Sequence, residues 1–74
     1  MPFAQIKVIE NVFDDQKKQE IIKRVTEALV SVEGEGLREK TVVVVEEVKS
    51  GNWAIGGNIL STQDVKKMAA AATH

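Results

Sequence analysis

The chain has 74 residues and lacks the residue types on which many small proteins depend. It has no Cys, which excludes disulfides and thiolate metal sites. Its one His is the last residue, His74, so we expect no metal site of any kind. A domain this small buries only about 60% of its unfolded surface, and disulfides, metals or assembly usually supply the missing stability. Because the first two are excluded, we expect a homo-oligomer.

Charge and hydropathy exclude further classes of protein. Ten Lys and Arg against eleven Asp and Glu give a net charge of −1. Nucleic-acid-binding proteins usually carry a basic surplus, so no such partner is expected. No apolar run approaches the roughly 20 residues of a membrane span, and the first ten residues lack the pattern of a signal peptide. The sequence therefore predicts a soluble, cytoplasmic protein without a membrane partner.

The first half of the chain predicts a β-α-β unit. Residues 3–9 alternate between apolar and polar side chains, which is typical of a strand with one buried face. Asp14 or Asp15 suits the start of a helix that runs to about Val32. Apolar residues recur in it at steps of three and four: Ile21, Ile22, Val25, Ala28, Leu29 and Val32.

The second strand is expected over residues 41–48, after a helix stop at Gly34 and Gly36. Four consecutive Val residues indicate a strand that is covered on both faces, as in a parallel sheet. The fold class is therefore α/β, with parallel strands and a crossover that is almost always right-handed. One helix covers only one face of the sheet, so another subunit should cover the other.

The last third predicts smaller elements. A short hairpin is expected around residues 55–59, and Ser61 to Asp64 resembles a capping box before a terminal helix over residues 65–72. We expect a single domain over residues 1–74, with residues 61–74 as a C-terminal extension.

Catalytic residue types are scarce, and Pro2 is the one candidate that the residues themselves offer. Methionine is routinely removed when a small residue such as Pro follows it, which would expose a secondary amine. A terminal amine titrates near pH 8, and burial or a nearby cation lowers that value. A neutral amine can act as a general base or as a nucleophile. The alternative is that Pro2 is merely a common residue at this position.

Four segments together resemble the 4-oxalocrotonate tautomerase family of the tautomerase superfamily. They are residues 2–6, which read Pro-Phe-Ala-Gln-Ile, residues 14–17, residues 21–28, and residues 51–57, which read Gly-Asn-Trp-Ala-Ile-Gly-Gly. The resemblance covers about residues 2 to 60. It implies a hexamer built from three dimers, a cofactor-free isomerase, and Pro2 as the base that moves a proton within a small unsaturated keto acid.

The resemblance also assigns residues to the substrate pocket. Trp53 stands where the family has an aromatic residue that walls the pocket, and Ile9 and Ile55 match apolar positions around it. Members of the family use two arginines to bind substrate carboxylates. The resemblance aligns their positions with Val12 and with Val42 or a residue near it, so neither arginine is present in this chain.

The missing cations leave several alternatives open. With a shift of one or two residues, Arg38 or Lys40 could bind substrate, although each could equally be an exposed loop residue. A monoacid, or a neutral aromatic or bulky compound stacked on Trp53, then fits better than a dicarboxylate. Other possibilities are a hydratase, dehalogenase or decarboxylase that uses Glu46 or Glu47, or a non-catalytic member of the family.

Overall fold

A computed structural model describes residues 1–72 of the chain, and His74 lies outside the described residues. The elements follow in the order β1 (Phe3–Ile9), α1 (Asp15–Glu33), the short 3-10 helix η1 (Glu35–Lys40), β2 (Val42–Val48), β3 (Trp53–Ile55), β4 (Asn58–Leu60) and α2 (Thr62–Ala72). The predicted β-α-β unit, hairpin and terminal helix are therefore confirmed.

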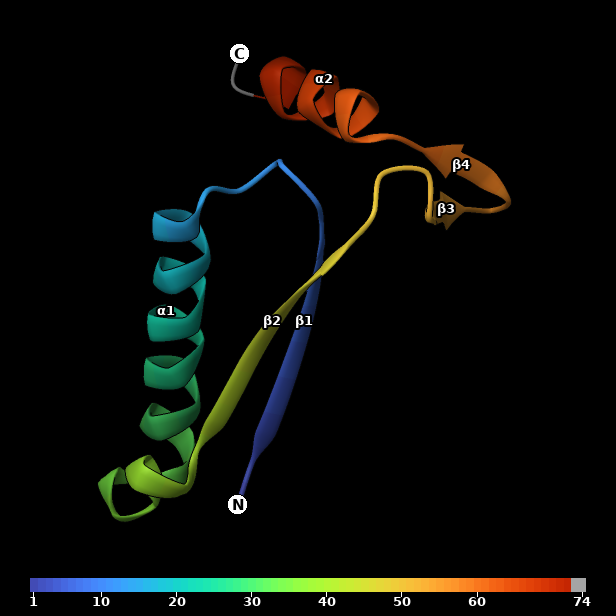
Figure 1. Cartoon of the computed structure of the whole chain (residues 1–74). Helices are drawn as coiled ribbons and strands as arrows, with labels where there is room; N and C mark the ends of the chain where they lie inside the picture. Colours follow the sequence, from blue (N-terminus) through green and yellow to red (C-terminus); the bar gives the residue numbers. More distant parts are fainter. Residues whose placement is uncertain (73–74) are drawn as a thin grey trace.

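The two long strands form a parallel pair with α1 beside it (Figure 1). The register runs from Phe3 opposite Val42 to Ile9 opposite Val48. Ala4 and Ile6 are half-buried, while the residues between them are exposed, as the alternation predicted. This places one face of β1 against α1 and leaves the other face open.

Local interactions fix both ends of α1. The side chain of Asp14 accepts a hydrogen bond from the Lys17 N–H at 2.8 Å, which identifies Asp14 as the cap. Gly34 ends the helix at φ 98°, and its N–H donates to the Val30 carbonyl at 2.8 Å. Gly36 does not adopt a positive φ. It lies within η1, an element that the sequence pattern did not predict.

The buried face of α1 differs in part from the predicted stripe. Val32 is 89% exposed, whereas Val30 is only 5% exposed. At 3.6 residues per turn these two side chains point to nearly opposite sides of the helix, and Val32 lies within the predicted apolar stripe. Within this subunit, only the side of α1 that carries Val30 is covered. Ala28 and Val32, two members of the predicted stripe, are exposed in this subunit.

The apolar core of one subunit is small. Its buried apolar residues within the described chain are Val8, Ile9 and Val30. On the open face of the sheet, Phe3 is 65% exposed and its neighbour Val42 is 43% exposed. No helix within residues 1–72 has the length and apolar character that crossing a membrane requires.

A tight hairpin joins the β-α-β unit to α2. Trp53 pairs with Leu60 across β3 and β4, and the turn has φ 58° at Gly56 and 83° at Gly57. Positive φ at both central residues is the geometry that two-residue hairpins favour. The predicted hairpin is therefore confirmed, and it extends two residues further at its N-terminal end and one residue further at its C-terminal end.

The predicted capping box precedes α2. The carboxylate of Asp64 accepts from the Ser61 N–H at 2.9 Å, and the Ser61 hydroxyl accepts from the Asp64 N–H at 3.1 Å. These hydrogen bonds lower the pKa of Asp64, the backbone donor more than the hydroxyl. The helix begins at Thr62, three residues before the predicted start.

Candidate active site

The residues expected at the active site lie in two groups at opposite ends of β1. Pro2 precedes the strand, and Arg38 and Lys40 belong to η1 at the same end. Ile9 ends the strand, and Trp53 and Ile55 form β3 beyond that end. Figure 1 shows the N-terminus and the hairpin far apart. One subunit therefore does not bring the two groups together.

Pro2 is tied to the start of the sheet. It is half-buried, and its carbonyl oxygen accepts a hydrogen bond from the Val42 N–H at 3.2 Å. Continuing the parallel register places Pro2 opposite Thr41. Met1 is 86% exposed. The backbone of Pro2 is thus held at the start of the sheet, and the residue before it is exposed.

Arg38 is engaged by two carboxylates of its own subunit. Its guanidinium donates to Glu27, with one bond at 3.0 Å, and to Glu35 at 2.8 and 2.9 Å. The hydrogen bonds from Arg38 lower the pKa of both Glu27 and Glu35. The two carboxylates in turn raise the pKa of Arg38 above its ordinary value. Arg38 therefore ties η1 to α1.

Lys40 is the freer cation at this end. It is exposed, and it forms no ion pair with any residue between 1 and 72. The next residue, Thr41, donates a hydrogen bond from its hydroxyl to the Glu33 carboxylate, which fixes the backbone beside Lys40. Lys40 is thus an exposed cation at the end of the sheet where Pro2 lies.

The other group of residues lines an apolar cavity of about 290 Å³. The predicted residues Ile9, Trp53 and Ile55 all lie on its wall. The remaining lining residues come from β1, the following loop, β4 and α2: Lys7, Val8, Val12, Phe13, Leu60, Val65 and Met68. The structure therefore brings together three predicted pocket residues, in a cavity with one charged side chain.

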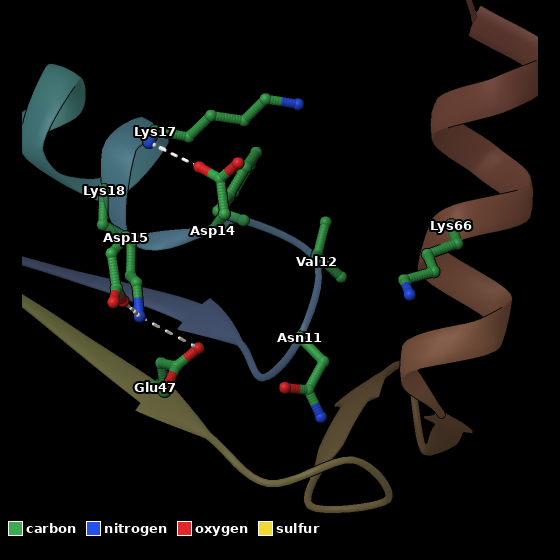
Figure 2. Close-up of a pocket in the computed structure, with 9 residues that line it drawn as sticks. Asn11, Val12, Asp14, Asp15, Lys17, Lys18, Glu47 and Lys66 are labelled. Carbon is green, nitrogen blue, oxygen red and sulfur yellow. Dashed lines mark hydrogen bonds and ion pairs between the residues drawn. The ribbon is translucent and has the colours of Figure 1, made fainter.

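A larger hollow of about 520 Å³ lies at the start of α1 and is polar (Figure 2). Lys18 pairs there with Asp15 at 3.2 Å and with Glu47 at 3.4 Å. Its pKa is raised, first by the hydrogen bond to Asp15 and then by the charge of Glu47. Lys66 faces this hollow from α2. Since it holds charges of both signs and includes neither Pro2 nor the candidate cations Arg38 and Lys40, we do not assign the site to it.

Comparison with known proteins identifies the family of the chain. The family described as "Tautomerase enzyme" matches residues 2–63. The chain belongs to the tautomerase family. It is 34% identical over 64 residues to the 2-hydroxymuconate tautomerase of Bacillus subtilis, covering 86% of this chain and all of that protein. It is 43% identical to the 2-hydroxymuconate tautomerase of Comamonas testosteroni over 57 residues, which cover 77% of this chain and 87% of that one.

Solved structures place the chain more narrowly within this family. A 4-oxalocrotonate tautomerase isozyme from Methylibium petroleiphilum is 34% identical, with a TM-score of 0.70 over 86% of this chain and 97% of that one. The resemblance to 4-oxalocrotonate tautomerase is therefore confirmed. With its named relatives, this tautomerase is an isomerase.

The structure also shows what occupies the two positions where the resemblance led us to look for arginines. Val12 lines the apolar cavity. Val42 lies on the open face of the sheet beside Phe3. Lys7 lines the same cavity as Val12, and Lys40 precedes Val42 by two residues. This tautomerase thus has apolar side chains at both places.

Among the cavity residues that were not predicted from the sequence, two come from the terminal helix. Val65 and Met68 belong to α2 and lie on the cavity wall. Their spacing of three residues, on a helix that is otherwise rich in Ala and Lys, was the only sign of a shared face. The sequence does not say what that face covers, because α2 reaches the cavity only through the hairpin.

Proposed function

We propose that this tautomerase moves a proton in a small unsaturated keto acid, with Pro2 as the general base. After removal of Met1, the neutral secondary amine takes a proton from the enol or from a carbon atom of the substrate. The resulting ammonium returns the proton to another carbon, so the amine is regenerated and no cofactor is consumed. The hydrogen bond that holds Pro2 against β2 is the observation that carries this proposal, because it fixes the base at the sheet edge.

Lys40 is the cation that we assign to this reaction. A positive charge near Pro2 lowers the pKa of the amine and keeps more of it neutral at pH 7. The same ammonium can stabilise the negative oxygen of a dienolate as it forms. Arg38, by contrast, is bound by Glu27 and Glu35. We assign it a positioning role, in which it fixes the turn that presents Lys40.

A complete site is proposed to need two copies of the chain. Pro2 and Ile9 stand at opposite ends of a strand of seven residues, which is about 20 Å at the usual rise per residue. The pocket wall formed by Ile9, Trp53 and Ile55 is therefore out of reach of Pro2 in the same subunit. A neighbouring subunit can supply it, and the exposed Phe3 gives such a neighbour an apolar contact. We propose a homo-oligomer, and specifically a hexamer of three dimers.

The structure favours this reaction over hydration, dehalogenation or decarboxylation by the same family. Those reactions would use a carboxylate such as Glu46 or Glu47 to activate water. Glu46 accepts a hydrogen bond from the Gln5 side chain, and Glu47 pairs with Lys18. Both carboxylates already have partners on the β-α-β unit, so neither is free to act as a base beside Pro2.

The test begins with Met-free protein, whose processing is checked by mass spectrometry. The conversion of 2-hydroxymuconate and of phenylenolpyruvate to their keto forms is followed by absorbance. We expect Pro2→Ala to lower kcat/KM by about 100-fold or more, the usual size of a general-base contribution. Unchanged activity in Pro2→Ala would rule out Pro2 as the base.

An NMR titration of the Pro2 nitrogen separates the proposed reaction from the alternatives. A pKa below 7 means that the amine is mostly neutral at pH 7, which supports its role as a base. A pKa well above 8 means that the amine is protonated and favours hydration or dehalogenation instead.

A further inference from the structure

The first turn of α2 is anchored to the end of β1. The Thr62 hydroxyl donates to the Glu10 carbonyl oxygen at 2.7 Å, and the Thr62 N–H donates to the Ser50 hydroxyl at 2.8 Å. The Ser50 N–H in turn donates to the Glu10 carboxylate at 2.7 Å. Thr62 is only 8% exposed. These bonds set the position of α2 relative to the apolar cavity. Ile9, the residue before Glu10, lies on the wall of that cavity.

From this anchor, α2 presents two apolar side chains to the cavity. Val65 and Met68 are three residues apart and so lie on one face of the helix. They line the cavity together with Trp53 and Ile55 of the hairpin. Met68 is 52% exposed, so this wall is open to an incoming molecule. Both residues lie beyond residue 63, where the match to the family ends.

The lining of the cavity favours a hydrocarbon group over a second carboxylate, because nine of its ten residues are uncharged. Lys7 is the one charged residue that lines it. An ionised carboxylate that leaves water for apolar surroundings is costly unless it is paired and hydrogen-bonded. A hydrocarbon group has no such cost. The volume of about 290 Å³ is at the lower end of the roughly 300–1,000 Å³ typical of ligand sites, which suits one ring or a short chain.

We propose that Val65 and Met68 complete an apolar subsite that takes a hydrocarbon substituent of the substrate. The enzyme then prefers enols and keto acids with an aryl or alkyl group over dicarboxylic acids. The inference rests on the proposed tautomerase function, which it extends from the reaction to the class of substrate. α2 is thus a determinant of specificity.

Binding of two unreactive acids tests the subsite directly. Trp53 is the only Trp of the chain, and its fluorescence reports occupation of the cavity. The probes are 3-phenylpropionate, which carries a ring, and succinate, which carries a second carboxylate. We expect 3-phenylpropionate to bind about 10-fold more tightly, as apolar contacts in a pocket usually give. Equal affinity, or tighter binding of succinate, would overturn the proposal.

Variants of α2 identify the residues responsible. Met68→Arg places a cation in the subsite and should remove the preference for 3-phenylpropionate, a change of about 10-fold in the ratio of the two Kd values. Gln63→Arg is the matched control, because Gln63 is exposed and lies on the opposite face of α2. Met68→Ala, which adds no charge, should weaken 3-phenylpropionate and leave succinate unchanged. The same ratio in Met68→Arg and Gln63→Arg would contradict the inference.

The assay distinguishes failure of this inference from failure of the proposed function. Neither acid undergoes tautomerisation, so the preference is measured without any contribution from the Pro2 amine. An active enzyme with no preference would refute the subsite alone. A preference in a protein whose activity survives Pro2→Ala would refute the role of Pro2 alone. Absence of binding by both acids, as when a second copy of the chain fills the cavity, would also refute the subsite.

Discussion

The carbonyl oxygen of Pro2 accepts a hydrogen bond from the backbone N–H of Val42 at 3.2 Å. This bond joins the proposed base to the start of β2, only two residues after Lys40. It brings an amine and a cation to one end of the sheet although 38 positions separate them in the chain. A change in either residue should therefore alter the same reaction.

Replacing Lys40 tests whether it is the cation of the site. Lys40→Met should lower kcat/KM for enol conversion by about 100-fold, as loss of one stabilising donor usually does. Lys40→Arg keeps the charge and should retain most of the activity. The control is Lys23→Met, on an exposed part of α1. If Lys40→Met and Lys23→Met had the same activity, Lys40 would be only a surface lysine.

Replacing Thr62 tests the anchor of α2. Thr62→Val keeps the shape but leaves the Glu10 carbonyl oxygen without its 2.7 Å partner. We expect a loss of about 1–3 kcal/mol in the free energy of unfolding, measured by chemical denaturation at a fixed protein concentration. In Thr26→Val, the lost bond goes to the Ile22 carbonyl within α1, so a smaller effect is expected. Equal losses in the two variants would argue against a special role for Thr62.

The hairpin turn gives a prediction about two glycines. Gly57 has φ 83°, a conformation in which a side chain is strained, so Gly57→Ala should destabilise the protein by about 1–2 kcal/mol. Gly36 has no such φ and open space where a Cβ would lie, so Gly36→Ala should be neutral or stabilising by up to about 1 kcal/mol. Denaturation followed by Trp53 fluorescence measures both. A harmless Gly57→Ala would contradict the turn geometry.

The ion pairs of Arg38 predict a dependence of stability on pH. The pKa values of Glu27 and Glu35 lie below their ordinary 4.5 in the folded protein. The stabilisation is therefore complete above about pH 4.5 and is lost as the pH falls through the lower folded values. Arg38→Met should lower the melting temperature at pH 7, and the difference from wild type should shrink at about pH 3.

The control for this prediction is Arg24→Met, which removes a single exposed pair with Glu20. It should change the melting temperature less than Arg38→Met at pH 7. Enzymatic activity adds a second readout. Because Arg38 is assigned only a positioning role, Arg38→Met should lower the activity less than Lys40→Met does. If the difference in melting temperature between wild type and Arg38→Met stayed constant with pH, the carboxylates of Glu27 and Glu35 would not contribute to stability through Arg38.

Local patterns predicted most of the elements correctly, because each depends on neighbours in the chain. The alternation of β1, the Asp14 cap and the box from Ser61 to Asp64 all involve residues at most a few positions apart. The resemblance in the segments around Pro2 and Trp53 also placed the chain in the right family. Ile9, Trp53 and Ile55 line one cavity, and their grouping came from the family resemblance and not from their spacing.

The sequence by itself determined the fold class, the absence of Cys and the candidate base, Pro2. Only the tertiary structure decided which cation is free, since Arg38 and Lys40 differ in the carboxylates that α1 and η1 bring to them. It also decided that Val30 rather than Val32 is covered, and that Met68 joins Trp53 at one cavity. Such contacts link residues far apart in the chain, so they follow from packing geometry and not from any local pattern.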